Sequence, residues 1–242
     1  MISDGKTIIR KIGKDSFLPH LRINQIKKVN DVLYVATGGG LVVASETDTT
    51  IYRKEEGLFS SIVINFDVDN DGNIWLTTIK GFSVITTDGK IINLSEDQYF
   101  RNSFCETIKA DRYGNIWVGT REGLLVFNKQ LFLRKGTLTN PKWFYKGDIP
   151  IDFITKITED QFGDFWIGTK TGVLKYEFKA NNNHKIARGN FTYYSIANLF
   201  IKDIYVDIEQ NIWLGTRGGG AVKIQGDIFW TYGLNDGLLN RE

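Results

Sequence analysis

The segment Asp111-Arg112-Tyr113-Gly114-Asn115-Ile116-Trp117-Val118-Gly119-Thr120 decides the fold of this chain. Near-copies of it recur in the same frame at residues 69–75, 160–166 and 207–213, and a shorter, divergent copy covers residues 28–34. The central aromatic residues lie 41, 42, 49 and 47 residues apart, and they are Tyr34, Trp75, Trp117, Trp166 and Trp213. Repeats of this length are typical of four-stranded propeller blades.

Each part of the motif has a local physical reason. Asp and Gly bracket a tight turn, because the carboxylate accepts backbone N–H groups and Gly adopts positive φ at little steric cost. The strand after the turn is apolar on both faces, which indicates a sheet covered on both sides. We expect the small residue two places after each aromatic to make room for a large ring of the next blade; these residues are Ala36, Thr77, Gly119, Gly168 and Gly215.

A second glycine turn leads into a third strand in every unit, as at 123–127 and 172–176. A more polar fourth strand closes most units, at 50–54, 90–94, 190–194 and 227–232. No segment has a helical hydrophobic period. The sequence therefore predicts an all-β propeller of about five four-stranded antiparallel blades, one domain over residues 1–242, and leaves open whether the ring is complete or a fragment.

Composition limits the possible partners. A hydrophobic fraction of 42% and an aromatic fraction of 13% suit a packed core. Thirty Lys and Arg against 28 Asp and Glu give a net charge of +2, and the signs alternate along the chain, so we expect no nucleic-acid partner. No apolar run reaches about 18 residues, and the start lacks the features of a secretory signal, so we expect no membrane contact by this segment. A cytoplasmic protein and a piece of an exported one both fit.

The repeat, together with the outer-strand text at 229–238, resembles the two-component regulator propeller repeat over about 23–238. That repeat is found in the extracytoplasmic sensor regions of hybrid histidine kinases, especially in Bacteroidetes. The resemblance implies a periplasmic sensor portion of a signalling protein, non-enzymatic in this segment and homodimeric through the full-length protein. Two features depart from the family: no membrane span, kinase or DNA-binding segment follows, and the family's propellers usually have more than five blades.

Few residues point to catalysis. His20 and His184 lie in non-equivalent segments, and Cys105 lies in an apolar run where a small buried residue is expected. The recurring aspartates occupy turn positions that need an acceptor, so we expect turn formation and not a metal site. The glycine-rich run 216–220 joins two strands and does not open a helix, which excludes a phosphate loop. We therefore expect no catalytic residues, no metal and no cofactor.

One set of side chains exceeds what the repeat requires. A cation follows the Gly-Thr strand in four units, and the four are Lys80, Arg121, Lys170 and Arg217. These turns should share a face with the connections between blades, including the long insertions 128–150, with Trp143 and Tyr145, and 178–190, with His184 and Lys185. We expect this rim to bind an oligosaccharide or another small ligand by stacking and hydrogen bonds. The alternative is that exposed turns simply carry Lys and Arg.

Three functions compete on this basis. The leading one is a non-enzymatic ligand-sensing propeller. The second is a structural interaction propeller of an exported assembly or secretion system, which needs no small-molecule pocket. A propeller lyase or hydrolase is third, because it would require paired His and carboxylate groups near the axis.

Overall fold

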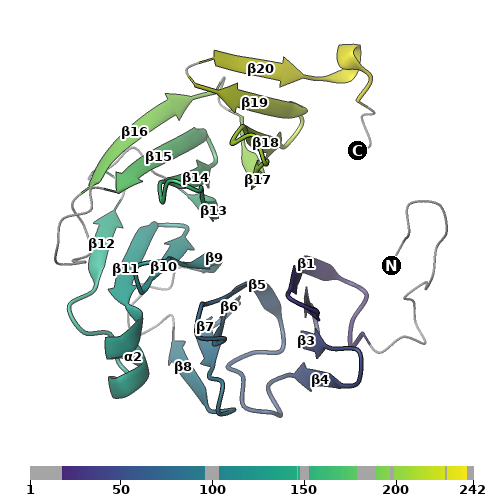
Figure 1. Ribbon diagram of the computed structural model, residues 1–242, viewed down its shortest axis with the longest axis vertical. Helices are drawn as coiled ribbons and strands as arrows, with labels where there is room; N and C mark the ends of the chain where they lie inside the picture. Colours follow the sequence, from purple (N-terminus) through teal and green to yellow (C-terminus); the bar gives the residue numbers. More distant parts are fainter. Residues whose placement is uncertain are drawn as a thin grey trace.

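The computed structural model describes residues 18–95, 104–145, 147, 153–178, 189–196, 199–226 and 228–238. This part of the chain forms five four-stranded antiparallel sheets, each built from strands consecutive in the sequence. The sheets are arranged in a ring, with the first strand of each nearest the centre (Figure 1). The predicted five-bladed all-β propeller is thus confirmed.

The strands have these bounds. Blade 1 contains β1 (Ile23–Val29), β2 (Val32–Thr37), β3 (Gly40–Ala44) and β4 (Thr49–Tyr52). Blade 2 contains β5 (Val63–Val68), β6 (Ile74–Thr78), β7 (Gly81–Ile85) and β8 (Ile91–Ser95). Blade 3 contains β9 (Cys105–Ala110), β10 (Asn115–Thr120), β11 (Gly123–Asn128) and β12 (Lys142–Tyr145). Blade 4 contains β13 (Ile154–Glu159), β14 (Phe165–Thr169), β15 (Gly172–Phe178) and β16 (Gly189–Ser195). Blade 5 contains β17 (Ile201–Val206), β18 (Ile212–Thr216), β19 (Ala221–Gln225) and β20 (Ile228–Tyr232), followed by the short 3-10 helix η1 (Leu234–Asp236).

The insertion at 128–150 differs from the expected loop. It contains the helix α2 (Lys129–Lys135), whose first turn is capped by the Asn128 side chain accepting from the Leu131 N–H, and the fourth strand of blade 3, β12. Phe132 of α2 is 1% exposed and packs in the core. The sequence showed no helical hydrophobic period here, because a capped helix of seven residues around one buried ring is too short to have one.

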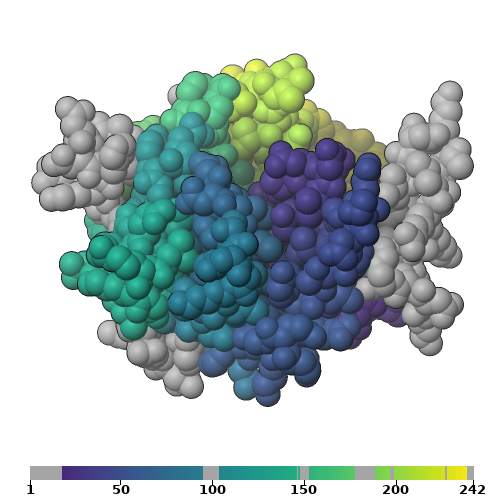
Figure 2. Space-filling model, turned by 60° about the horizontal axis from the view of Figure 1, so that its bottom comes forward, coloured from purple at the N-terminus to yellow at the C-terminus, as the bar shows by residue number. Residues whose placement is uncertain are grey.

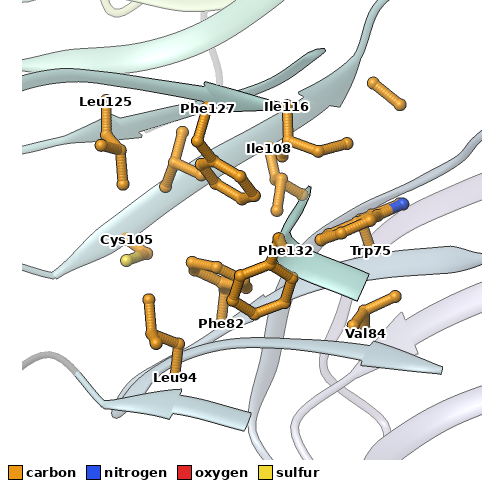
Figure 3. Packing of buried hydrophobic residues seen from close by; sticks show 12 residues of the cluster. Trp75, Phe82, Val84, Leu94, Cys105, Ile108, Ile116, Leu125, Phe127 and Phe132 are labelled. Carbon is orange, nitrogen blue, oxygen red and sulfur yellow. The ribbon is translucent and has the colours of Figure 1, made fainter. Parts of the chain in front are cut away.

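The core lies between the blades. Four clusters of buried side chains join blades 1 and 2, 2 and 3, 3 and 4, and 4 and 5. In the cluster between blades 2 and 3, Trp75 and Phe82 face Phe127 and Phe132 (Figure 3). Within the described residues, no such cluster joins blade 5 to blade 1. Cys105 is fully buried in this core, as predicted.

The repeated aspartate does more than form its turn. In the blade 3 copy, Asp111 Oδ1 accepts the backbone N–H groups of Tyr113 (2.9 Å) and Asn115 (2.7 Å). Its Oδ2 accepts the indole Nε1–H of Trp117 at 2.9 Å. The same indole bond recurs from Trp75 to Asp69, Trp166 to Asp160 and Trp213 to Asp207. The carboxylate therefore fixes both the hairpin and the orientation of the large ring six residues later.

The small residue two places after the aromatic has a different role from the one expected in blades 3 and 4. A Cβ on Gly119 would lie 2.4 Å from the Ile154 side chain, and one on Gly168 would lie 2.8 Å from Ile201. These isoleucines begin the first strand of the next blade. At these two positions the glycine therefore makes room for an isoleucine of the next blade, not for a large ring, because β10 lies against β13 and β14 lies against β17.

Candidate functional site

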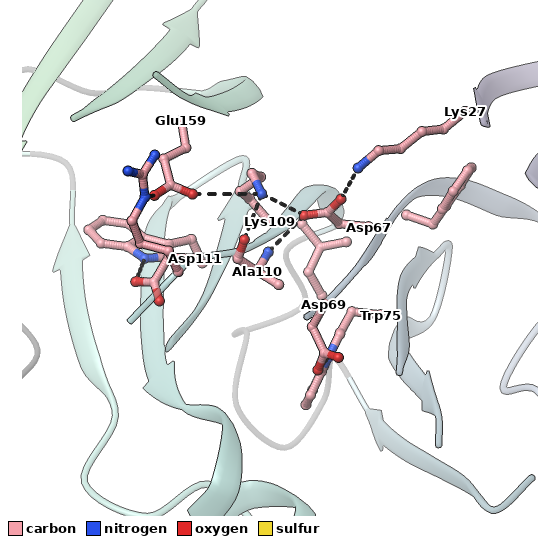
Figure 4. Close-up of polar contacts among 12 residues, drawn as sticks. Lys27, Asp67, Asp69, Trp75, Lys109, Ala110, Asp111 and Glu159 are labelled. Atoms are coloured by element: carbon pink, nitrogen blue, oxygen red, sulfur yellow. Dashed lines mark hydrogen bonds and ion pairs between the residues drawn. The ribbon is translucent and has the colours of Figure 1, made fainter. Parts of the chain in front are cut away.

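The innermost strands carry a chain of alternating charges from blade to blade. Asp67 on β5 is 3% exposed and pairs with Lys27 on β1 and with Lys109 on β9, the latter at 2.8 Å (Figure 4). Lys109 also lies 3.9 Å from Glu159 on β13, which pairs with Arg112 at 2.6 Å. Asp67 in addition accepts the backbone N–H of Ala110 at 3.1 Å. These groups therefore link blades 1 to 4 around the axis.

The two carboxylates of this chain differ in acidity. Burial alone raises the pKa of Asp67, but the ammonium groups of Lys109 and Lys27 outweigh it and hold the pKa below its ordinary value. Burial raises the pKa of Glu159 above its ordinary value, because Lys109 and Arg112 offset the desolvation only in part. Asp67 is thus firmly anionic at neutral pH and serves as an ion-pair partner, not as a proton donor.

A cavity lies on the axis at the starting ends of the inner strands. It has a volume of about 680 Å³ and is lined by β1, β5, β9, β13 and β17. Most of its charged side chains are paired: Lys27 with Asp67, Lys156 with Asp203 (2.8 Å), and Glu106 with Arg121 (2.7 Å). A smaller cavity of about 230 Å³ lies against the charge chain. The larger cavity on the axis is therefore polar, and its size suits a small polar ligand.

The turns with the predicted cations do lie on the same face as the blade connections. The start of each inner strand pairs with the end of the second strand, as Ile154 does with Thr169. In blade 5 the connection touches the turn directly, because the Arg217 N–H donates to the Phe200 carbonyl at 2.9 Å. We call this side the turn face.

Cations and aromatic rings alternate on the turn face. The Arg121 guanidinium lies 4.4 Å from the ring centroid of Phe104 and 5.3 Å from that of Phe153. The Lys170 ammonium lies 4.3 Å from the same Phe153 ring, so one ring separates two of the predicted cations. Such contacts fix the position of a cation and leave its outer side accessible, as the exposure of Arg121 and Lys170 confirms.

The row continues into blade 5 and adjoins the cavity. The Phe153 and Phe200 rings are 6.2 Å apart, and the Lys202 ammonium lies 4.8 Å from Phe200. Lys202 also lines the axial cavity, as does Glu106, the partner of Arg121. We call Phe104, Arg121, Phe153, Lys170, Phe200 and Lys202 the cation–aromatic row.

The other predicted site residues have different places. Lys80 is exposed at the corresponding turn of blade 2, between β6 and β7. Trp143 and Tyr145 stack on each other at 5.3 Å on β12, the outermost strand of blade 3, and Trp143 also packs against the core between blades 2 and 3. They therefore belong to the outer edge of the blade, because their segment is a paired strand and not a loop. His184 and Lys185 lie outside the described residues.

Sequence reasoning missed the three phenylalanines. Each directly precedes the first strand of its blade, and Phe104, Phe153 and Phe200 are 49 and 47 residues apart, the same spacings as those of Trp117, Trp166 and Trp213. This shared period is a signal that an alignment of the connections would have found. His20 is exposed near the start of β1 and accepts the Arg22 N–H.

Over the parts of the chain described above, no three His, Cys, Asp or Glu side chains gather as metal ligands. The same residues include no helix long and apolar enough to cross a membrane.

Three solved structures with the same fold are informative. The extracellular domain of the hybrid two-component system BT3049 from B. thetaiotaomicron is 20% identical, with a TM-score of 0.66 over 85% of this chain and 28% of that one. PorZ, a surface component of the type-IX secretion system of Porphyromonas gingivalis, is 18% identical, with a TM-score of 0.68 over 93% of this chain and 35% of that one. Virginiamycin B lyase from Staphylococcus aureus is 12% identical, with a TM-score of 0.66 over 87% of this chain and 69% of that one.

These identities show a common fold and no more. The chain spans about a third or less of the first two proteins. No protein-family model and no curated protein matches the sequence. The resemblance inferred from the repeat is confirmed in the sense that extracellular domains of Bacteroides two-component systems are among the structural neighbours.

Proposed function

We propose that this chain is a non-enzymatic recognition propeller, part of an extracytoplasmic sensor, that binds a polar ligand on its turn face. The observation that carries the proposal is the cation–aromatic row beside the axial cavity. Aromatic rings with ammonium and guanidinium groups over their faces provide apolar surfaces and hydrogen-bond donors within one patch. That combination suits a sugar ring bearing a carboxylate or sulfate, so an anionic oligosaccharide is the ligand class.

An enzymatic role has less support. The ionisable groups lining the cavity are largely held in ion pairs, which leaves few groups suited to proton transfer. Cys105 is buried in the core, and His20 lies against the turn at Gly38 and Gly39 of blade 1 and does not line the axial cavity. The similarity to a lyase rests on 12% identity and carries the fold alone.

A structural role in a secretion assembly is the second candidate, favoured by the similarity to PorZ over 93% of the chain. The two candidates differ in a simple way. A sensor binds a small ligand through the row, whereas an assembly component needs only a protein partner.

The test is titration calorimetry with oligosaccharides of equal length, neutral or containing uronic acids. We expect the anionic series to bind and the variant Arg121→Gln/Lys170→Gln to lose about a hundredfold in affinity, since each of the two lost charged contacts is worth about 1.5 kcal/mol. The stability of this variant should fall by no more than about 1 kcal/mol, because the exposed cations lose only a surface ion pair with Glu106 and contacts with phenylalanine rings.

The matched control is Lys28→Gln/Lys90→Gln, which makes the same charge change at two exposed sites on the opposite face. This control should bind like the parent. An equal loss of affinity in both double variants would show that the effect comes from net charge alone. If no oligosaccharide binds, the assembly role is favoured.

A further inference from the structure

The two axial cavities form one column that is rich in lysine. In β5, β9, β13 and β17, two apolar residues three places apart pack between the blades, as Ile154 and Ile157 do. Polar residues beside them line the cavities, and the two cavities share Lys27 and Lys156. Four lysines line the column, one each from β1, β9, β13 and β17: Lys27, Lys109, Lys156 and Lys202. We call the two cavities with these lysines the axial column.

The carboxylates of the axial column do not balance its cations. Four of them line it: Asp67, Glu106, Glu159 and Asp203. Two of the four bind arginines from outside the column, and the other two bind lysines of the column. The arginines are Arg112 and Arg121. Among the described residues, six cations therefore face four carboxylates, which leaves two positive charges in excess on the axis.

Lys202 is the lysine that no carboxylate balances. Its ammonium lies 4.8 Å from the ring centroid of Phe200, and across the described strands and turns no carboxylate forms an ion pair with it. The adjacent Asp203 is bound to Lys156 instead, at 2.8 Å. Lys202 is exposed and lines the larger cavity. Its N–H donors are therefore available to an anion, and Lys156 keeps further donors because an ammonium group has several.

Asn65 on β5 adds a neutral donor. Its Oδ1 accepts the Ile108 N–H at 3.0 Å and the Thr107 hydroxyl at 3.3 Å, which fixes the orientation of the amide. Asn65 lines both cavities, so its NH2 group is a donor at their shared wall. Gln25, in the corresponding place on β1, uses both ends of its amide on the backbone of Phe66.

The axial column is entered from the turn face. Clusters of buried side chains fill the space between blades 1 and 2 and between blades 2 and 3. Seen from outside, these three blades form one continuous surface (Figure 2). The larger cavity lies at the starting ends of the inner strands, which are on the turn face. A small solute therefore passes the cation–aromatic row before it reaches Lys202.

We propose that the axial column binds a small oxyanion, with Lys202 and Lys156 as charged donors and Asn65 as a neutral one. A polar cavity of about 680 Å³ with excess positive charge attracts anions, because the surrounding protein focuses its field. The oxyanion is a carboxylate, sulfate or phosphate group. It is either free or carried by a ligand on the cation–aromatic row, and only the second case rests on the function proposed above.

The test is calorimetric titration with inorganic sulfate in a chloride buffer at constant ionic strength. We expect the variant Lys156→Gln/Lys202→Gln to bind sulfate at least about tenfold more weakly than the parent, because charged contacts are lost. The control Lys28→Gln/Lys90→Gln makes the same charge change outside the column and should bind like the parent. Lys170→Gln alters the row and leaves every group of the column in place, so it should also bind sulfate like the parent.

The column variant should remain folded. Lys202 is exposed, and Asp203, which loses its partner Lys156, has a side chain that is 67% exposed. Its Tm without sulfate should therefore be close to that of the control. The single variant Lys202→Gln repeats the titration at an exposed site alone and should also weaken sulfate binding.

The outcomes separate the two sources of the oxyanion. If sulfate does not bind, the oligosaccharide containing uronic acids is titrated instead, and a larger loss of affinity in the column variant than in the control assigns the oxyanion to that ligand. Sulfate binding without oligosaccharide binding would retain the column and remove the function proposed above. The proposal is overturned if neither anion distinguishes the column variant from the control, or if sulfate binding is lost only in Lys170→Gln.

Discussion

Blades 4 and 5 have nearly the same local structure on the face that points away from the preceding blade. The surroundings of these two faces are very different. In blade 4, the Trp166 and Tyr194 rings are 5.9 Å apart at 22°, with the Lys175 ammonium 5.8 Å from the tryptophan. In blade 5, the Trp213 and Tyr232 rings are 5.7 Å apart at 30°, with Lys223 at 5.6 Å. Trp166 is buried, whereas the corresponding Trp213 is partly exposed. Tyr232 beside Trp213 is 37% exposed.

The difference teaches that geometry within a blade is set by its own sequence, while burial is set by the neighbour. The Asp-to-indole bond is 3.1 Å in blade 4 and 2.8 Å in blade 5, so it forms without a covering blade. Most of the stabilisation should therefore come from the contact between blades and not from the motif itself.

The largest expected effect compares the two tryptophans. Trp166→Ala should reduce the free energy of unfolding by about 3–5 kcal/mol, as for other buried aromatic residues. Trp213→Ala should cost less than about 2 kcal/mol, since only part of its surface is removed from water. Urea denaturation measures both, with Trp117→Ala as a second covered case. Equal costs at Trp166 and Trp213 would break the comparison.

The next effect concerns the inner strands, where Asp67 and Tyr205 occupy corresponding places opposite the motif aromatic. Asp67→Asn should cost about 3 kcal/mol at pH 7, because it breaks a buried contact with two lysines. Tyr205→Phe should change stability by less than about 0.5 kcal/mol, because this side chain is 63% exposed.

The pH dependence of the Asp67 effect has a definite sign. The folded-state pKa of Asp67 is below the ordinary value, so its stabilisation is fully present above the unfolded value of about 3.9. It is lost as the pH falls through the lower folded value. Denaturation at several pH values should therefore show a constant difference between parent and Asp67→Asn above about pH 5, shrinking below about pH 4. A difference that grows with acidity would contradict this assignment.

A smaller effect is expected at the turn carboxylates. Asp160 accepts the N–H groups of Phe162, Asp164 and the Trp166 indole, and Asp160→Ala should cost about 1–3 kcal/mol. Asp207→Ala removes the same kinds of bond in an uncovered blade, where water replaces them, so its cost should be lower. Thermal unfolding of the two variants checks the order, and a reversed order would mean that the carboxylate acts independently of burial.

Much of the fold could be predicted from the sequence, because the repeat fixes its own turns and strands. The Asp and Gly positions, the doubly covered second strand and the blade count all follow from residues such as Asp111, Gly114 and Trp117. The partner of Gly119 could not be predicted, since it depends on how closely adjacent inner strands approach. The strand β12 was also missed, because its Trp143 and Tyr145 resemble an exposed loop when their pairing with β11 is unknown.

The site was predicted only in part. Equivalent turns were expected on one face, and the structure places Arg121 and Lys170 there around Phe153. The phenylalanine itself lies just before β13, outside the motif, so its role depends on the packing of one blade's connection against its neighbour's turn.

Hydroxyl-radical footprinting of the tryptophans in the unmodified chain tests the central claim most directly, because indole oxidation reports solvent access residue by residue. We predict slow oxidation of Trp75, Trp117 and Trp166, faster oxidation of Trp213 and the fastest oxidation of Trp230. Protection of Trp213 equal to that of Trp166 would contradict the account, because it would mean that the last blade is already covered.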